Sequence, residues 1–164
     1  MITIEVVTPQ KALVLKDVRL RALQDTPSAF GSTYARESLF TDEKWIERAT
    51  PQSGVNITYI AMDNDLACGL VGGFLNREDG ARVTLVSMWV APTHRRKGVG
   101  QRLIQSVGDW AKSHGVFVLF LLVTSNNDVA IKFYERIGFE KTGHMVPYPN
   151  DSSLFEYEMK KIIS

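Results

Sequence analysis

Hydrophobic and polar positions in the first third of the chain predict one strand and two helices. Residues 2–7 are rich in β-branched side chains, which indicates a strand. The Thr8-Pro9 dipeptide is typical of a helix start, and apolar residues then recur at helical spacing until the helix ends near residue 25. After a polar connection with scattered aromatic residues, a second and shorter helix is expected to begin at Thr41 or Asp42.

The middle of the chain predicts three antiparallel strands. Residues 56–62, 66–75 and 82–90 have strand character. Short segments rich in Asp, Asn and Gly separate them, which is typical of tight turns. We therefore expect these strands to follow one another as hairpins.

The second half of the chain alternates helices with strands. A helix with one apolar face follows a basic, glycine-containing loop and ends at Gly115. The unbroken apolar run 116–123 predicts a strand that is covered on both faces. Asn126 or Asn127 is expected to cap a further helix, which Gly138 ends. Two final strands are expected, over residues 139–143 and 154–161.

Length and composition fit one globular domain that spans residues 1–164. Of the 164 residues, 45% are hydrophobic and 23% are charged, which is ordinary for a folded protein. A chain of this size can bury a core without disulfides or metals. These values exclude disordered, collagen-like and coiled-coil classes as descriptions of the whole chain. The elements together predict the α+β class, with a mostly antiparallel sheet and helices on its faces.

Charge and cysteine content exclude several kinds of partner. The 19 Lys and Arg against 18 Asp and Glu give a net charge of +1, so we expect no nucleic-acid partner. The single cysteine, Cys68, alternates with Leu66 and Leu70, which favours a small buried residue over a nucleophile. The scattered histidines have no metal-ligand spacing, and we expect no metal.

The first residues and the longest apolar stretch indicate in which cellular compartment the protein is expected. The first residues have no basic region followed by an apolar run, so no signal peptide is expected. The longest apolar stretch, residues 115–123, is far short of the roughly 20 residues that a membrane-spanning helix needs. We expect a cytoplasmic protein with no membrane partner.

The segment Arg95-Arg-Lys-Gly-Val-Gly100 carries the strongest chemical signal. It joins a strand to the N-terminus of a helix, where backbone N–H groups are free and the helix dipole is positive. Its glycines allow an anion to approach the backbone, and its basic residues add charge. We predict a pyrophosphate site; the alternative is a turn with solvated basic residues. The P-loop pattern is absent, and Leu103 replaces the third small residue of the dinucleotide fingerprint, which argues against ATP and NAD.

A second segment, residues 127–139, is expected to form a helix that lies beside the helix after this loop. Ala130 and Tyr134 are four residues apart and share a helix face. Taken alone, a tyrosine at such a position is more typical of a core residue with a satisfied hydroxyl than of a catalyst.

Together the two segments resemble the GNAT superfamily of N-acetyltransferases. The acyl-CoA motif of that family, Arg/Gln-x-x-Gly-x-Gly/Ala, stands here as Arg95 to Gly100, preceded by Val90-Ala-Pro92. The downstream pattern of the family is met at Asn127, Ala130, Tyr134, Gly138 and Phe139. The order of elements is similar over nearly the entire chain. The resemblance implies a splayed, mostly antiparallel, seven-stranded sheet flanked by four helices.

The resemblance also implies a cosubstrate and the residues that bind it. The cosubstrate is acetyl-CoA, with no metal. In such enzymes the strand before the loop parts from its neighbour and its backbone holds the pantetheine arm, while the amides of the turn hold the pyrophosphate. Tyr134 would lie near the thioester sulfur and act as the catalytic acid. The implied cofactor-binding residues are Met88, Trp89, Val90, Arg95, Arg96, Lys97, Gly98, Val99, Gly100, Gln101 and Asn127.

The acceptor site is implied only in outline. By analogy it involves the connection between the first two helices and the loop before the last strand. Aromatic and acidic residues there would suit an amine. The candidates are Phe30, Tyr34 and Glu37, together with Tyr148 and Asp151. The acceptor is expected to be a small-molecule or protein amine, and homodimerisation is left open.

No residue stands out as the general base. Some family members carry a glutamate on the strand before the loop, but residues 83–90 hold no carboxylate. Glu37, Glu156 and Glu158 are candidates by residue type, although each fits an exposed surface charge better. Proton removal through ordered water is the other route. We predict an N-acetyltransferase in which an amine attacks acetyl-CoA directly in a ternary complex; the alternative is a noncatalytic acyl-CoA-binding sensor or interaction module.

Overall fold

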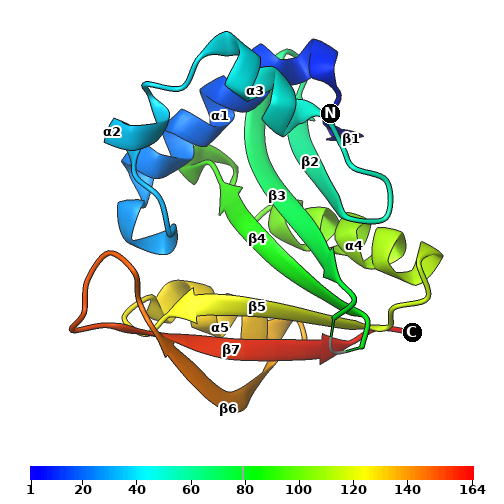
Figure 1. Ribbon diagram of the computed structural model, residues 1–164, viewed down its shortest axis with the longest axis vertical. Helices are drawn as coiled ribbons and strands as arrows, with labels where there is room; N and C mark the ends of the chain where they lie inside the picture. The colour runs from blue at the N-terminus through cyan, green and yellow to red at the C-terminus, as the bar shows by residue number, and fades with distance from the viewer. Residues whose placement is uncertain (79) are drawn as a thin grey trace.

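A computed structural model describes residues 1–78 and 80–164, whose strands form a seven-stranded sheet (Figure 1). The strands are β1 Ile2–Val6, β2 Asn56–Asp63, β3 Leu66–Asn76, β4 Arg82–Val90, β5 Val118–Thr124, β6 Glu140–Pro147 and β7 Phe155–Ile162. Their order is β1-β2-β3-β4-β5-β7-β6. Only β4 and β5 are parallel neighbours in this sheet; every other described pair is antiparallel. The expected fold class is confirmed.

The helices include the four expected from the sequence and one further turn. They are α1 Ala12–Asp25, α2 Tyr34–Glu37, α3 Asp42–Ala49, α4 Val99–Ser113 and α5 Asp128–Arg136. The single turn α2 lies in the connection that was expected to lack helix, and the Thr33 hydroxyl caps it by accepting a hydrogen bond from the Arg36 amide. No helix in the described part of the chain is both long and apolar enough to cross a bilayer.

The two parallel strands part soon after they begin. Register between β4 and β5 covers only the pairs from Val83–Leu119 to Leu85–Leu121. Beyond these pairs the strands diverge, and Figure 1 shows a V between them that opens toward their C-terminal ends. The splay implied by the resemblance is therefore present in the fold.

A bulge on the other edge of β4 accompanies this divergence. The register with β3 shifts between Leu70 and Gly72, so that one residue of β3 faces two residues of β4. Ser87 lies at the bulge with φ of +59°, a left-handed conformation that is uncommon for serine. The bend turns the second half of β4 away from β5.

Helices cover the two faces of the sheet unequally. A Cβ built on Gly73 would touch Val107 and Trp110 of α4, whereas one on the adjacent Gly72 would touch Val86. Because neighbouring strand residues point to opposite faces, α4 covers the face of Gly73. The face of Gly72 holds α1 and α3. Cys68 is fully buried in the core, as expected.

Candidate functional site

The basic turn leads into α4 with unusual backbone geometry. Arg96 and Gly98 both have positive φ, +62° and +79°, and Gly98 is the N-cap of α4. The Arg102 amide donates to the Gly98 carbonyl at 3.1 Å, which closes the first helical turn. The amides of the preceding helical residues, Val99 to Gln101, have no helical acceptor. The turn therefore presents free N–H groups at the positive end of a 15-residue helix.

Arg95 ties this turn to the end of α1. Its Nε donates to the Val90 carbonyl at 2.9 Å, and its Nη2 donates to Asp25 at 2.7 Å. The same carboxylate accepts the indole N–H of Trp89 at 3.0 Å. Arg95 is thus paired with Asp25, whereas the exposed Arg96 and Lys97 have no ion-pair partner among the described residues.

Gly98 and Gly100 of the motif are required for different structural reasons. A Cβ on Gly98 would meet no atom within 4 Å, so its positive φ is what requires glycine. A Cβ on Gly100 would lie 2.9 Å from Met88 and 3.0 Å from Phe133. Gly100 therefore lets the start of α4 pack against β4 and α5.

The second motif positions Asn127 and Tyr134 on α5. Asn127 caps the helix through its side-chain oxygen, which accepts from the Ala130 amide at 3.2 Å, so its NH₂ group remains able to donate. Tyr134 is buried, with ring centroids 5.4 Å from Phe133 and 5.7 Å from Phe139. Burial raises the pKa of the Tyr134 phenol, which keeps its proton at neutral pH.

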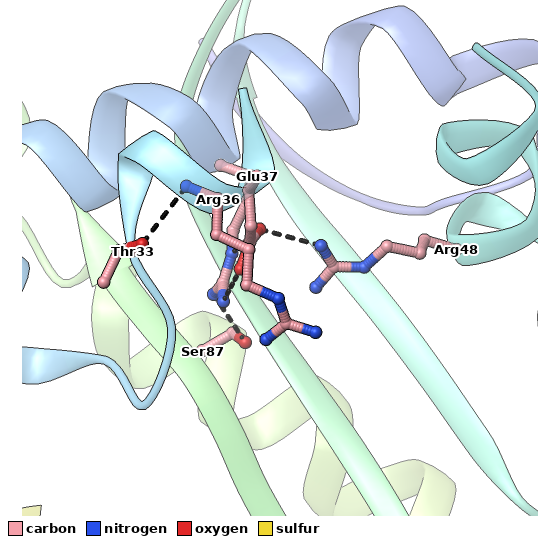
Figure 2. Close-up of polar contacts among 6 residues, drawn as sticks. Thr33, Arg36, Glu37, Arg48 and Ser87 are labelled. Atoms are coloured by element: carbon pink, nitrogen blue, oxygen red, sulfur yellow. Dashed lines mark hydrogen bonds and ion pairs between the residues drawn. The ribbon is translucent and has the colours of Figure 1, made fainter. Parts of the chain in front are cut away.

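On the α1 face of the sheet, distant segments form a buried charged cluster (Figure 2). We call Arg19, Glu37 and Arg48 the Arg–Glu–Arg cluster. Arg19 holds both oxygens of Glu37, at 2.9 and 3.0 Å, and Arg48 donates to Glu37 at 2.7 Å. Arg19 also donates to the Ser87 hydroxyl at 2.9 Å, so the cluster braces the β4 bulge.

The sequence predicted that Glu37 would be an exposed surface charge, and this prediction is wrong. The residue is only 2% exposed. Burial favours the neutral carboxyl, but the hydrogen bonds and charge of Arg19, with the hydrogen bond of Arg48, outweigh it and lower the pKa of Glu37 to about 2. Its carboxylate is already shared by two guanidinium groups.

The site residues predicted from the sequence did not include Arg19, Arg48 or Ser87. A signal existed for Arg19 alone, which lies four residues after Leu15 and three before Ala22, on the buried side of α1. A charged residue in an apolar stripe requires a partner. The partner and the contact to β4 depend on the tertiary structure.

The two loops expected to form the acceptor site do meet. The Tyr148 hydroxyl donates to the Phe30 carbonyl at 2.6 Å, and the Asn150 amide donates to it at 3.1 Å. Asp151 instead accepts from the amide and hydroxyl of Ser153 within its own turn.

Tyr34 is not brought to these loops. It lines a separate hollow beside α1, together with Leu13 and Asp17. The structure thus groups Phe30 with Tyr148 and leaves Tyr34 apart.

The remaining two glutamates of the sequence analysis lie on β7. Glu158 accepts from Thr142 at 2.8 Å and pairs with Arg82 at 3.4 Å. Glu156 is half-buried opposite Thr124, and burial raises the pKa of its carboxyl. In the described structure its side chain has no ion-pair partner.

Comparison with known proteins places this arrangement in a family. The sequence pattern of the acetyltransferase (GNAT) family matches residues 19–139. The chain belongs to this family. A GCN5-related N-acetyltransferase from Kribbella flavida is 27% identical, with a TM-score of 0.72 over 99% of this chain and 98% of that one. The family resemblance inferred from the two motifs is confirmed.

One curated protein is similar in sequence, and one further solved structure is similar in fold. Streptothricin acetyltransferase from Streptomyces lavendulae is 37% identical over 89 residues, which are 52% of this chain and 46% of that protein. An acetyltransferase from Salmonella typhimurium, solved with its cofactor acetyl-CoA, is 20% identical with a TM-score of 0.77, over 100% of this chain and 95% of that one. The chain spans about half or less of the length of the first curated relatives it matches.

Proposed function

We propose that this GNAT-family chain transfers the acetyl group of acetyl-CoA to a primary amine in a ternary complex. The amine nitrogen bonds to the thioester carbon, and the carbon–sulfur bond then breaks to release CoA. One proton must leave the nitrogen and one must reach the thiolate sulfur. An amine is mostly protonated at neutral pH, so its deprotonation is part of the reaction.

The observation that carries this proposal is the gap between β4 and β5 beside the free amides of α4. Backbone groups of β4 beyond Leu85 have no partner on β5 within the described register. They can bond an amide-bearing arm such as pantetheine. An N–H near Val90 can also donate to the oxyanion of the tetrahedral intermediate. The amides of Val99 to Gln101 would then hold the pyrophosphate.

Glu156 is our candidate for the group that accepts the amine proton. Alternation along β7 puts Glu156 on the same face as Glu158, which contacts Arg82. Val86 shares that face of β4, at the point where β4 and β5 part. Glu37 and Glu158 already have cationic partners, whereas Glu156 has none in the described structure. A raised pKa makes its carboxylate a better base.

Tyr134 would supply the proton to the leaving thiolate. It lies on α5, which Figure 1 shows behind β5, and its buried phenol is protonated at neutral pH. Base and acid therefore approach the gap from opposite faces of the sheet. Solvent restores the Tyr134 proton after each turnover.

Calorimetry with acetyl-CoA, NAD and ATP tests the binding part of this proposal. We expect saturable binding of acetyl-CoA alone; binding of a nucleotide without acetyl-CoA would refute it. A panel of amines assayed for CoA-thiol release then tests catalysis. Binding of acetyl-CoA without release by any amine would favour the noncatalytic alternative. With a productive amine, Glu156→Gln should flatten the rise of kcat/KM with pH, and an unchanged profile would return proton removal to water.

A further inference from the structure

A cavity lies next to the Arg–Glu–Arg cluster, on the face of the sheet opposite α4. Its volume is about 250 Å³. Its polar lining comes from five side chains on four elements, namely Arg19, Arg48, Asn56, Thr58 and Ser87. Leu15, Trp45 and Phe74 are among its apolar lining. Its lining joins α1 and α3 to the strands β2, β3 and β4.

The cavity reaches the place where acetyl transfer would occur. Val86 and Ser87 line it. They directly follow Leu85, the last residue of β4 that pairs with β5. A molecule held in the cavity can therefore extend into the gap between β4 and β5.

The charge of the cavity is positive. Two guanidinium groups, from Arg19 and Arg48, line it, and none of its described lining residues is acidic. Glu37 beside it neutralises one of them and is held ionised at neutral pH. One positive charge remains without a partner. Arg48 uses only Nη1 toward Glu37 and is 32% exposed, so part of its fork can bond a ligand.

A buried donor without an acceptor lies in the same wall. Trp45 is 1% exposed and lines the cavity, yet its indole N–H has no hydrogen-bond partner in the described structure. Leaving such a donor unpaired costs about 1–3 kcal/mol. The Arg48 guanidinium lies 5.3 Å from the centre of the Trp45 ring. Both donor-bearing side chains therefore lie in the same part of the cavity wall.

We propose that this cavity binds the carboxylate of an amino-acid-like acceptor, so that the chain acetylates an amine which carries an anionic group. A single unpaired positive charge matches a monoanion, and the planar fork of Arg48 matches a carboxylate. The volume is below the roughly 300–1,000 Å³ of pockets for drug-sized ligands, which suits an acceptor of amino-acid size. The inference rests on the proposed acetyl transfer.

Matched acceptors test it. L-lysine, L-2,4-diaminobutyrate and L-methionine would each be compared with the corresponding carboxamide, by CoA-thiol release and by calorimetry on CoA-loaded protein. We expect kcat/KM or affinity to be at least about tenfold higher for one or more of the carboxylates, the loss expected when a charged hydrogen bond is removed. Equal or better use of every carboxamide would overturn the proposal.

Variants show whether the preference comes from this cavity. Arg48→Met should reduce the preference to about twofold or less, Arg48→Lys should retain part of it, and acetyl-CoA affinity should not change. Lys44→Met removes a charge from the same helix outside the cavity and is the matched control. Trp45→Phe keeps an aromatic ring without the N–H and should also weaken the preference. A carboxylate preference that survives both Arg48→Met and Trp45→Phe in folded protein would refute the assignment.

Failure of the two proposals can be told apart. Acetyl-CoA binding with no binding or acetylation of any carboxylate would overturn the anionic acceptor and leave acetyl transfer standing. Absence of acetyl-CoA binding would overturn both.

Discussion

The regions on the two sides of β4 differ in whether their polar groups have partners within the protein. On the α4 side, the turn from Arg95 to Gln101 presents backbone amides that have no partner in the protein. On the α1 side, Arg19 and Glu37 of the Arg–Glu–Arg cluster are buried and Arg48 is partly exposed, and the carboxylate is shared by the two guanidinium groups. The proposed function gives the first region a pyrophosphate ligand, whereas the second region joins α1, α2 and α3 to β4. The proposed binding surface is therefore made of backbone groups, whereas side chains make the contacts that hold β4.

The two regions also differ in how far apart their residues lie in the sequence. The turn is contiguous in sequence, although Arg95 also bonds to the distant Asp25. The Arg–Glu–Arg cluster and Ser87 join residues 19, 37, 48 and 87, and the hydrogen bond from Arg19 to Ser87 spans 68 positions. We therefore expect substitutions in the Arg–Glu–Arg cluster to affect mainly stability, and substitutions in the turn to affect mainly acetyl-CoA binding.

The largest expected effect is on folding, in Glu37→Gln. Removing this charge leaves Arg19 buried without its anion, which should lower the free energy of unfolding by about 3–5 kcal/mol. Urea unfolding measures the loss. The control is Glu47→Gln, whose exposed pair with Lys44 should contribute less than about 1 kcal/mol. Similar losses of unfolding free energy in both variants would contradict the stabilising role of the Arg–Glu–Arg cluster.

The pH dependence of stability reports on the same carboxyl. Its pKa falls from 4.5 to about 2 on folding, so it contributes stability above pH 4.5 that is lost as the pH falls through about 2. The contribution is on the order of 3 kcal/mol. Unfolding measured from pH 7 to pH 2 should show this loss in the wild-type chain, and Glu37→Gln should lack that component.

On the turn, Gly98→Ala should weaken acetyl-CoA binding by about 10–100-fold, because strain at φ of +79° would shift the amides. Gly115→Ala is a matched control. Gly115 has φ of +76° and, like Gly98, no atom within 4 Å of a built Cβ. Both variants should lose similar stability, but only Gly98→Ala should lose affinity in calorimetry. Equal affinities would show that the turn does not bind the cosubstrate.

Tyr134→Phe should lower kcat by at least about tenfold, since general-acid help is typically worth about 10²–10⁴-fold and water can replace part of it. The ring and its contacts to Phe133 and Phe139 remain, so acetyl-CoA affinity should change little. Steady-state kinetics with a productive amine measures kcat. Tyr34→Phe, at an exposed position, is the control. An unchanged kcat with rate-limiting chemistry would leave Tyr134 as a packing residue.

The smallest effect is expected in Asp25→Asn, at the contact between the turn and the end of α1. Asp25 accepts from Trp89 and Arg95, so its change should cost about 1–2 kcal/mol of stability. The free amides of α4 remain, and acetyl-CoA affinity should fall by less than about threefold. Thermal unfolding and calorimetry measure the two quantities. A loss of affinity as large as that of Gly98→Ala would mean that Arg95 orders the turn.

The sequence by itself determined most elements and the local geometry of the proposed cofactor site. Periodicity, helix caps and glycines act over a few residues, so the strand–turn–helix unit at Gly98 and the Asn127 cap could be predicted without any tertiary contact. Boundaries were less well determined. The first of the two final strands was expected over residues 139–143, but β6 continues to Pro147. Pairing with β7, rather than local propensity, extends that strand.

Only the tertiary structure decided the surroundings of the proposed acceptor cavity. Glu37 looked like a surface charge because nothing near it in the sequence pairs with it, yet the fold places it between Arg19 and Arg48. The bulge at Ser87 and the cavity beside it depend on how α1, α3 and β4 pack. A charged pair between distant segments forms only after the chain has collapsed, because its energy depends on burial and geometry that no local pattern encodes. Backbone amides at a helix N-terminus are free wherever such a helix begins, and so the sequence alone reveals them.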